Sequence, residues 1–197
     1  MTTGDESGSA RQFDPWTKVR TLHDLAADEV ISAFQKAVRR GELEEATLLA
    51  YEMYATSEEL EECLWHRLQV ISVEDVGSGS FLEPVIVDAV YRMHGRVPRG
   101  RGDRFLFAVH AIRLLVGSTK DRTSDELANW AAGVVQNGQR LPQIPDHALD
   151  MHTRRGQEMG RDLLHFLETG AFVNNEVPHR DTTYREWLLA AAKAERK

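Results

Sequence analysis

The sequence predicts an all-α fold of about eight helices packed as an antiparallel bundle. Apolar residues recur at the three- and four-residue spacing of amphipathic helices through most of the chain. No segment alternates apolar and polar residues with a period of two, and no Val/Ile run lies between turn residues as a strand would. Short connections between the first helices favour antiparallel neighbours.

Composition is that of a soluble globular protein. Of the 197 residues, 42% are hydrophobic and 28% charged, which predicts one helical domain over 21–197 after a disordered polar tail over 1–20. Phe13 and Trp16 are the exception in that tail, and we expect them to fold back on the body of the protein rather than to anchor a partner. The net charge of −7 argues against non-specific DNA binding by the whole surface. The single Cys63 excludes an internal disulfide. No apolar run approaches the ~20 residues needed to span a bilayer, and no signal peptide is recognisable, so we expect a cytoplasmic protein.

Three helices are predicted in the first third, over 28–40, 42–54 and 57–71. The first carries acids early and arginines late, as the helix dipole favours, and ends at Gly41. The third begins at Ser57, a preferred N-cap residue.

Five further helices are predicted over 80–93, 103–117, 123–135, 154–170 and 182–197. Ser80 and Thr123 each have a Glu three residues later, the spacing of a capping box. The apolar stripes from Phe105 to Val116 and from Tyr184 to Ala191 are candidates for buried seams.

Two adjacent carboxylates, Glu74 and Asp75, stand unexpectedly at the end of the helix over 57–71, shortly before Gly77. The C-terminus of a helix prefers cations. The pair could bind a hard divalent cation, accept hydrogen bonds from the first amides of the next helix, or pair with an arginine of a neighbouring helix. We interpret Glu74, Asp75 and Gly77 as a structural motif at a corner between helices.

An arginine-rich loop is the second candidate site. A flexible basic loop can contact phosphates without reading sequence, but no aromatic residue is interleaved for stacking, and a solvated loop is the alternative. The eight Glu and absent Lys or Arg of residues 42–62 would repel DNA nearby. Candidate phosphate contacts are Arg96, Arg99, Arg101, Arg104 and Lys120, with a second basic group at Arg154, Arg155 and Arg161.

The third candidate is an Asp/His-rich segment that could bind a metal or transfer protons. Its spacing matches no established ligand pattern, and Asp150 with Arg154 could simply form a helix ion pair. The phosphate-binding loop and the common hydrolase motifs are absent from the sequence, and no cofactor is predicted. Candidate metal ligands are Asp146, His147, Asp150, His152 and His165.

Two ordered motifs carry a resemblance to a known family. "DEVISAFQKAVRRGELEEATLLAYEMY" followed by "LWHRLQVISVEDVG" resembles the C-terminal region of the replication-associated recombination protein A (MgsA) family, AAA+ ATPases related to the Werner helicase-interacting protein. In that family a segment like "ISAFQK" leads from the ATPase core into a helical collar, and one ending in "SEDVG" closes a later collar helix. The match covers residues 24–77. It weakens downstream, where Gly117, Ser118 and Thr119 precede Lys120 in place of the family's Ala-Pro, and the family's final Tyr-Gly-Lys-Gly-Tyr-like motif is not recognisable.

The resemblance implies a collar-like helical module for oligomerisation and partner binding, tetrameric in the family, without an ATPase domain. Residues 21–137 would be the family-like part and 138–197 a divergent C-terminal part. We therefore expect a non-enzymatic module linked to DNA replication, recombination or repair, acting with a separate AAA+ ATPase or with replication proteins. A metal-dependent enzyme or regulator and a nucleic-acid-binding protein are the two alternatives.

Overall fold

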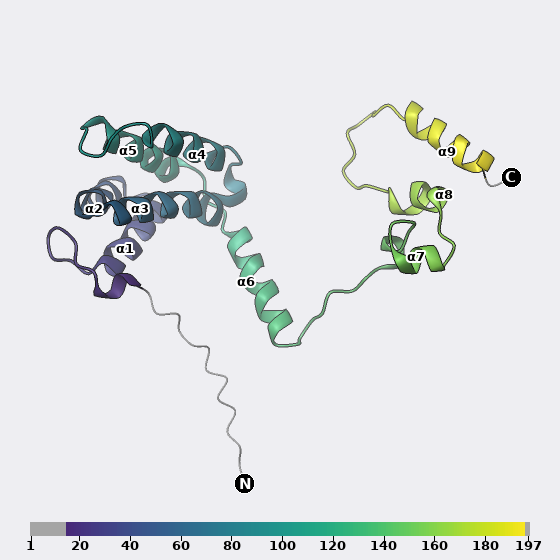
Figure 1. Cartoon of the computed structure of the whole chain (residues 1–197), viewed down its shortest axis with the longest axis horizontal. Coiled ribbons are helices and arrows are strands. Elements are labelled where there is room, and N and C mark those ends of the chain that lie inside the picture. The colour runs from purple at the N-terminus through teal and green to yellow at the C-terminus, as the bar shows by residue number, and fades with distance from the viewer. Residues whose placement is uncertain (1–14, 196–197) are drawn as a thin grey trace, which may run out of the picture. The chain divides into compact units, whose positions relative to one another are not determined.

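The computed structural model describes residues 15–195, which are helical and contain no strand, so the predicted all-α class is confirmed (Figure 1). One isolated antiparallel bridge joins Arg20 and Ala26. The chain divides into two compact units between Gly133 and Val134, whereas the sequence analysis expected one domain with a change of character at residue 138. Each unit is therefore described by itself.

Among the described residues, the first unit contains five α-helices, most of a sixth that ends past the unit boundary, and three short helical segments. A 3-10 helix at its start (η1), a π-helix (η2) and a 3-10 helix (η3) accompany the longer helices. The bounds are η1 Pro15–Lys18, α1 Ala27–Arg40, α2 Leu43–Thr56, α3 Glu58–Ile71, η2 Ser72–Val76, η3 Gly77–Gly79, α4 Glu83–His94, α5 Asp103–Gly117 and α6 Thr123–Gln136.

Helix ends in this unit largely follow the sequence signals. Gly41, at φ 82°, ends α1 in the left-handed conformation that glycine adopts without steric cost. The Ser57 hydroxyl accepts from the Leu60 amide at 3.1 Å and so caps α3. At α6, however, the capping side chain is Asp121, which accepts from the Thr123 amide at 2.9 Å.

The core of the first unit lies between α1, α2, α3, α4 and α5, which pack side by side (Figure 1). Small residues on α2 allow close approach of its neighbours, and large apolar side chains from α1, α3 and α5 fill the interior. Trp16 of η1 packs against this core, as expected of the aromatic residues in the N-terminal tail. The fully buried core side chains include Phe34, Ala46, Ala50, Met53, Leu60, Leu64, Leu68, Ile71, Ile112 and Leu115.

The second unit is built from short elements around a small core of Leu164, Leu167 and Ala192. Its helix α9 matches the prediction, but most of the predicted seam is exposed, with Tyr184 at 77% and Trp187 at 69%. Its elements are η4 Asp146–Ala148, α7 Arg154–Glu158, α8 Leu163–His165, η5 Phe166–Gly170 and α9 Thr183–Glu195.

The continuous helix predicted over 154–170 is wrong. Gly160 has φ +70°, a left-handed conformation that stops α7. Asp162 then caps a new helix, since its carboxylate accepts from the His165 amide at 3.1 Å. Gly160 and Asp162 therefore divide one apolar pattern into α7 and a second helical segment made of α8 and the π-helix η5.

Residues 1–14, which include Phe13 and most of the predicted tail, lie outside the described residues, as do 196–197. Across the part of the chain that is described, no helix combines the length and apolar character needed to cross a bilayer.

Replacement of Gly77 should destabilise the first unit strongly. The residue has φ +51°, and an added Cβ would collide with the backbone carbonyl of Asp121. We expect Gly77→Ala to lower the free energy of unfolding by more than about 2 kcal/mol, because backbone strain and a steric clash coincide. The measurement is urea denaturation followed by circular dichroism.

Gly41→Ala is the matched control, because Gly41 also has positive φ but open space around its Cα. Gly41→Ala should lower the free energy of unfolding by only about 1 kcal/mol, because the left-handed backbone conformation is its one unfavourable feature. Equal losses for the two variants would contradict a role for close packing at Gly77.

Candidate functional site

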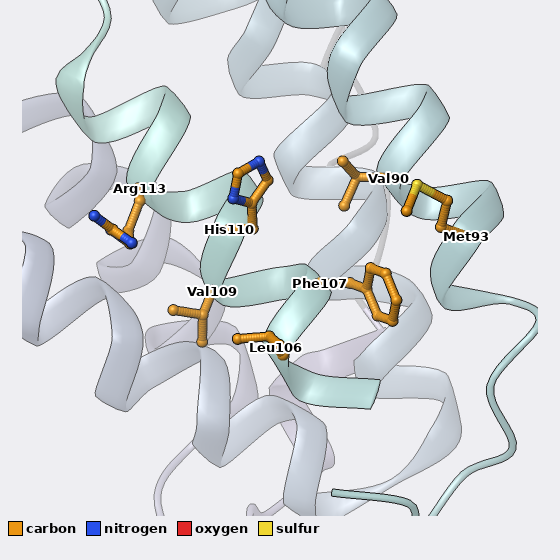
Figure 2. Close-up of a pocket in the computed structure, with 7 residues that line it drawn as sticks. All are labelled: Val90, Met93, Leu106, Phe107, Val109, His110 and Arg113. Atoms are coloured by element: carbon orange, nitrogen blue, oxygen red, sulfur yellow. The ribbon is translucent and has the colours of Figure 1, made fainter. Parts of the chain in front are cut away.

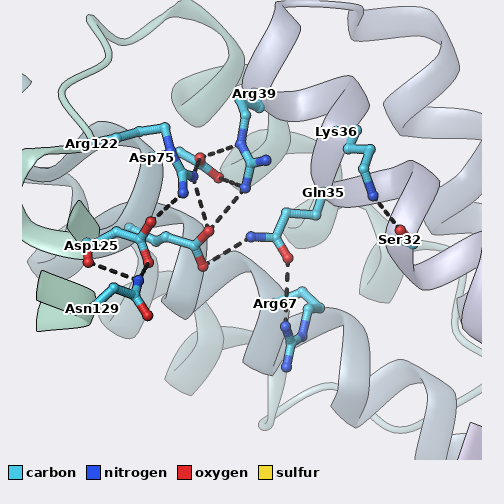
Figure 3. A network of polar contacts seen from close by, with 10 residues as sticks. Ser32, Gln35, Lys36, Arg39, Arg67, Asp75, Arg122, Asp125 and Asn129 are labelled. Carbon is cyan, nitrogen blue, oxygen red and sulfur yellow. Dashed lines mark hydrogen bonds and ion pairs between the residues drawn. The ribbon is translucent and has the colours of Figure 1, made fainter. Parts of the chain in front are cut away.

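The acid pair at the end of α3 lies at a corner where three segments of the first unit meet (Figure 3). The π-helix η2 turns the chain there and buries Asp75 completely. Arg39 of α1 donates from Nε to Asp75 Oδ1 at 2.5 Å, and Arg122, before α6, donates to the same oxygen at 2.6 Å. The buried carboxylate is thus held between two arginines from distant parts of the sequence.

Glu74 completes the corner. Its Oε1 accepts from Arg39 and from Arg122, both at 2.9 Å, and its Oε2 accepts from the Gln35 side-chain amide at 3.0 Å. These hydrogen bonds, with the Asp75 carboxylate, raise the pKa of Arg122 well above its ordinary value. Among the three readings of the acid pair, the geometry favours ion pairing with arginines of neighbouring segments.

The Lys120 side chain also makes hydrogen bonds within the first unit. Its ammonium donates to the carbonyls of Leu115 and, at 2.9 Å, Ser118, and so satisfies the end of α5. Burial lowers the pKa of Lys120, while Asp75 and Glu83 oppose that shift. The structure therefore uses this predicted phosphate contact as a helix cap.

A second charge cluster is centred on Glu61 of α3, which is 1% exposed. Its Oε1 accepts from Arg104 Nε at 2.7 Å and lies 2.6 Å from Nε2 of the buried His94. Arg99 donates to its Oε2 at 2.5 Å. Burial of the Glu61 carboxyl raises its pKa, but the hydrogen bonds from Arg104 and His94 outweigh burial and hold that pKa below its usual range.

The arginine-rich loop is therefore largely structural. Arg104 is 8% exposed and also donates to the Val97 carbonyl. Arg99 donates to the Tyr54 carbonyl at 2.6 Å and lies over the Tyr54 ring, 5.3 Å from its centroid. Of the four loop arginines, only Arg96 and Arg101 keep solvent-exposed side chains that are outside this cluster.

The predicted metal ligands of the second unit are not brought together. Asp146 pairs with Arg161 at 2.6 Å, and the Asp150 carboxylate accepts from the His152 amide at 2.9 Å to fix a turn. Within the described residues, no group of three or more His, Cys, Asp or Glu side chains could hold a metal ion. The predicted helix pair does not form either, since Arg154 pairs with Glu158 at 3.2 Å.

The other basic and histidine candidates of the second unit either bind nearby groups of that unit or are exposed. Arg161 spans the turn and donates to the Asp146 and Leu149 carbonyls at 2.6 and 2.7 Å. Arg155 and His147 are exposed. His165 has a buried Nε2 without a hydrogen-bond partner in the structure.

An apolar groove on the first unit was not identified as a site by sequence reasoning. One part, of about 380 Å³, lies between α4 and α5 (Figure 2), and an adjoining part, of about 470 Å³, lies between α2 and α5. Val109 and Arg113 of α5 line both parts, and the two parts together are called the groove. The lining side chains are Leu43, Glu44, Thr47 and Leu48 of α2, Val90 and Met93 of α4, and Leu106, Phe107, Val109, His110 and Arg113 of α5.

The groove exists because α5 is apolar on more than one face. Its buried stripe is Ala108, Ala111, Ile112 and Leu115, while Leu106 on another face is 65% exposed. On α2, Leu48 is likewise 66% exposed, and Leu43 is 38% exposed. In the sequence, this surface could have been recognised because apolar residues of α5 cover a wider part of the helix circumference than one packed face requires.

Arg113 lines both parts of the groove, where Glu44, Thr47 and His110 are the other polar groups. Its guanidinium has no ion pair or hydrogen bond within the described residues, in contrast to Arg39, Arg99 and Arg104. A cation beside exposed apolar side chains can bind an apolar segment that also carries a carboxylate.

No protein-family model matches the chain, and no curated protein is significantly similar to it.

Loss of the Asp75 carboxylate should loosen the corner. We expect Asp75→Ala to lower the free energy of unfolding by about 2 to 3 kcal/mol, less than a fully buried pair would cost, because Arg39 and Arg122 are 30% and 31% exposed and can be hydrated. The control Asp88→Ala removes a solvent-exposed i,i+4 pair with Arg92 on α4 and should cost under about 0.5 kcal/mol. Thermal denaturation compares them, and equal losses would contradict the structural role.

Glu61→Gln should destabilise the chain in a pH-dependent way. Because the variant places a neutral amide beside Arg104 and His94, its free energy of unfolding should be about 2 to 3 kcal/mol lower near neutral pH. Because the folded pKa of Glu61 is lowered, its stabilisation is complete above the unfolded pKa of about 4.3 and is lost as pH falls through the folded pKa. Urea titrations between pH 7 and 3 should show the difference shrinking with acid, while the exposed Glu58→Gln shows little difference throughout.

Proposed function

We propose that the chain is a non-enzymatic helical interaction module that assembles with further copies of itself through the apolar groove of its first unit. The observation that carries this proposal is the groove itself, which spans three helices and leaves Leu48 and Leu106 about two-thirds exposed. Exposed apolar surface of this extent on a well-packed unit is typical of protein–protein contact sites.

The charged clusters support a binding module over an enzyme. Glu61 and Asp75, the most buried carboxylates of the first unit, have their oxygens occupied by arginines. Neither lines the groove. A general acid or base must reach the substrate, and these groups serve the fold instead.

The link to DNA replication and repair rests on the resemblance to the replication-associated recombination protein A family. The two stretches that carry it, 31–36 and 72–77, meet in space, since Gln35 donates to Glu74 at 3.0 Å. A contact between separated motifs is what a shared structural corner would require. We propose a collar-like oligomer, tetrameric as in that family, that acts with a separate AAA+ ATPase or with replication proteins.

Nucleic-acid binding is not favoured as a second function. Arg99, Arg104 and Lys120 are occupied by internal contacts, which leaves Arg96 and Arg101 in the loop. Two phosphate contacts would give weak binding with a shallow dependence on salt.

Light scattering after size exclusion tests self-association. We expect a multimer of the 22.3 kDa chain at low and high salt, because burial of apolar surface is not screened by ions. Leu48→Ser, in the groove, should reduce the mass toward one chain. Val85→Ser, equally exposed at 65% but outside the groove, should leave it unchanged. A wild-type monomer at all concentrations would refute the proposal.

A further inference from the structure

The groove contains one acid and one arginine that do not pair with each other in a single chain. Glu44 of α2 and Arg113 of α5 both line the part between these two helices. Within the described residues, neither side chain makes an ion pair or a hydrogen bond. Among the described residues that line the groove, Glu44 is the one carboxylate and Arg113 the one guanidinium. The same surface therefore holds both halves of an ion pair that one copy does not form.

Apolar side chains accompany both charges. Val109 lies one helical turn before Arg113, projects from the same side of α5 and lines both parts of the groove (Figure 2). On α2, Leu48 lies one turn after Glu44 and is 66% exposed, while Leu106 of α5 is 65% exposed. All of these residues belong to the first unit. Contact with a second apolar surface would remove them from water and bring the two charges into an environment where pairing matters.

We propose that the groove packs against the groove of a second copy across a twofold axis, with Glu44 of each copy paired to Arg113 of the other. This inference rests on the proposed self-association and names the residues that meet. In a twofold contact the same patch serves both copies, so the patch must be complementary to itself. An acid and an arginine in one groove meet that requirement, because two reciprocal ion pairs then form at once.

Symmetry restricts which side chains can lie near the axis. A residue close to a twofold axis faces its own equivalent in the other copy. Val109 tolerates that position because it is apolar, whereas two Arg113 side chains would repel each other without an acid beside each of them. A partner of different sequence would have to supply an arginine and an acid in the reverse arrangement. A second copy supplies exactly the groups required.

The proposed contact joins copies in pairs. Each copy uses its groove once, and a twofold contact leaves neither groove open. A head-to-tail contact would instead leave one groove open at the end of every unclosed assembly. The tetramer expected from the family resemblance would consist of two such pairs, held together by a second contact outside the groove.

Charge reversal tests the two ion pairs. Glu44→Arg and Arg113→Glu each place like charges at both reciprocal positions. Each variant alone should therefore dissociate at least about tenfold more readily, and its mass in light scattering should shift toward the 22.3 kDa of one chain. The double variant E44R/R113E restores both pairs with exchanged signs and should recover the wild-type mass. An equimolar mixture of the two single variants should also recover it, because every contact between them joins opposite charges.

Two matched controls lie outside the groove. Glu45→Arg makes the same change of charge and also removes an acid from the first turn of α2, but Glu45 does not line the groove. Arg101→Glu reverses an exposed arginine of the loop before α5. Both variants should retain the wild-type mass. Circular dichroism verifies that every variant keeps its helices.

The outcomes separate this inference from the proposed function. A monomeric wild-type protein would refute self-association and the twofold pairing together. A multimeric wild type that Leu48→Ser dissociates, but that neither charge reversal changes, would leave self-association through the groove standing and overturn the reciprocal pairs. Dissociation by both single reversals without recovery in the double variant would also overturn them, since the groove would then face a different surface of the second copy.

Discussion

The first unit depends on a buried carboxylate held by two arginines. Asp75 is fully buried, and such a charge is tolerated only when it is paired and hydrogen-bonded. Arg39 comes from α1, Arg122 from the segment before α6, and Asp75 itself from η2. The hydrogen bonds to this one carboxylate therefore hold three chain segments together. The same corner brings Gly77 against the backbone at Asp121, two residues before the start of α6.

A second buried carboxylate has an equivalent role around α3 and α4. Glu61 ties α3 to His94 of α4 and to Arg104 at the start of α5, while Arg99 joins the connecting loop to both Glu61 and Tyr54. These arginines resemble nucleic-acid contacts in the sequence, because a cluster of basic residues in a loop is typical of phosphate binding. In the folded chain their charge is balanced internally, and they contribute to the fold.

The two charge clusters leave apolar surface uncovered. Side chains of α2, α4 and α5 line a groove, in which Leu48 and Leu106 are about two-thirds exposed. A folded chain gains stability when such a surface is removed from water. Association between copies would bury it, which connects the surface of the first unit with the proposed role as an interaction module.

The sequence by itself determined the helical class and most helix positions, because apolar periodicity and capping residues such as Ser57 and Gly41 act locally. It also marked Glu74, Asp75 and Gly77 as structural. Only the tertiary structure decided their partners, since Arg39 and Arg122 lie far from them in the chain. The tertiary structure also decided which apolar side chains remain exposed. Periodicity shows that Leu106 and Leu127 each lie on an apolar helix face, but their exposure depends on which helices pack against that face. The side chains proposed as metal ligands do not come together in the fold. Asp146 instead pairs with Arg161, and the Asp150 carboxylate accepts a hydrogen bond from the His152 amide.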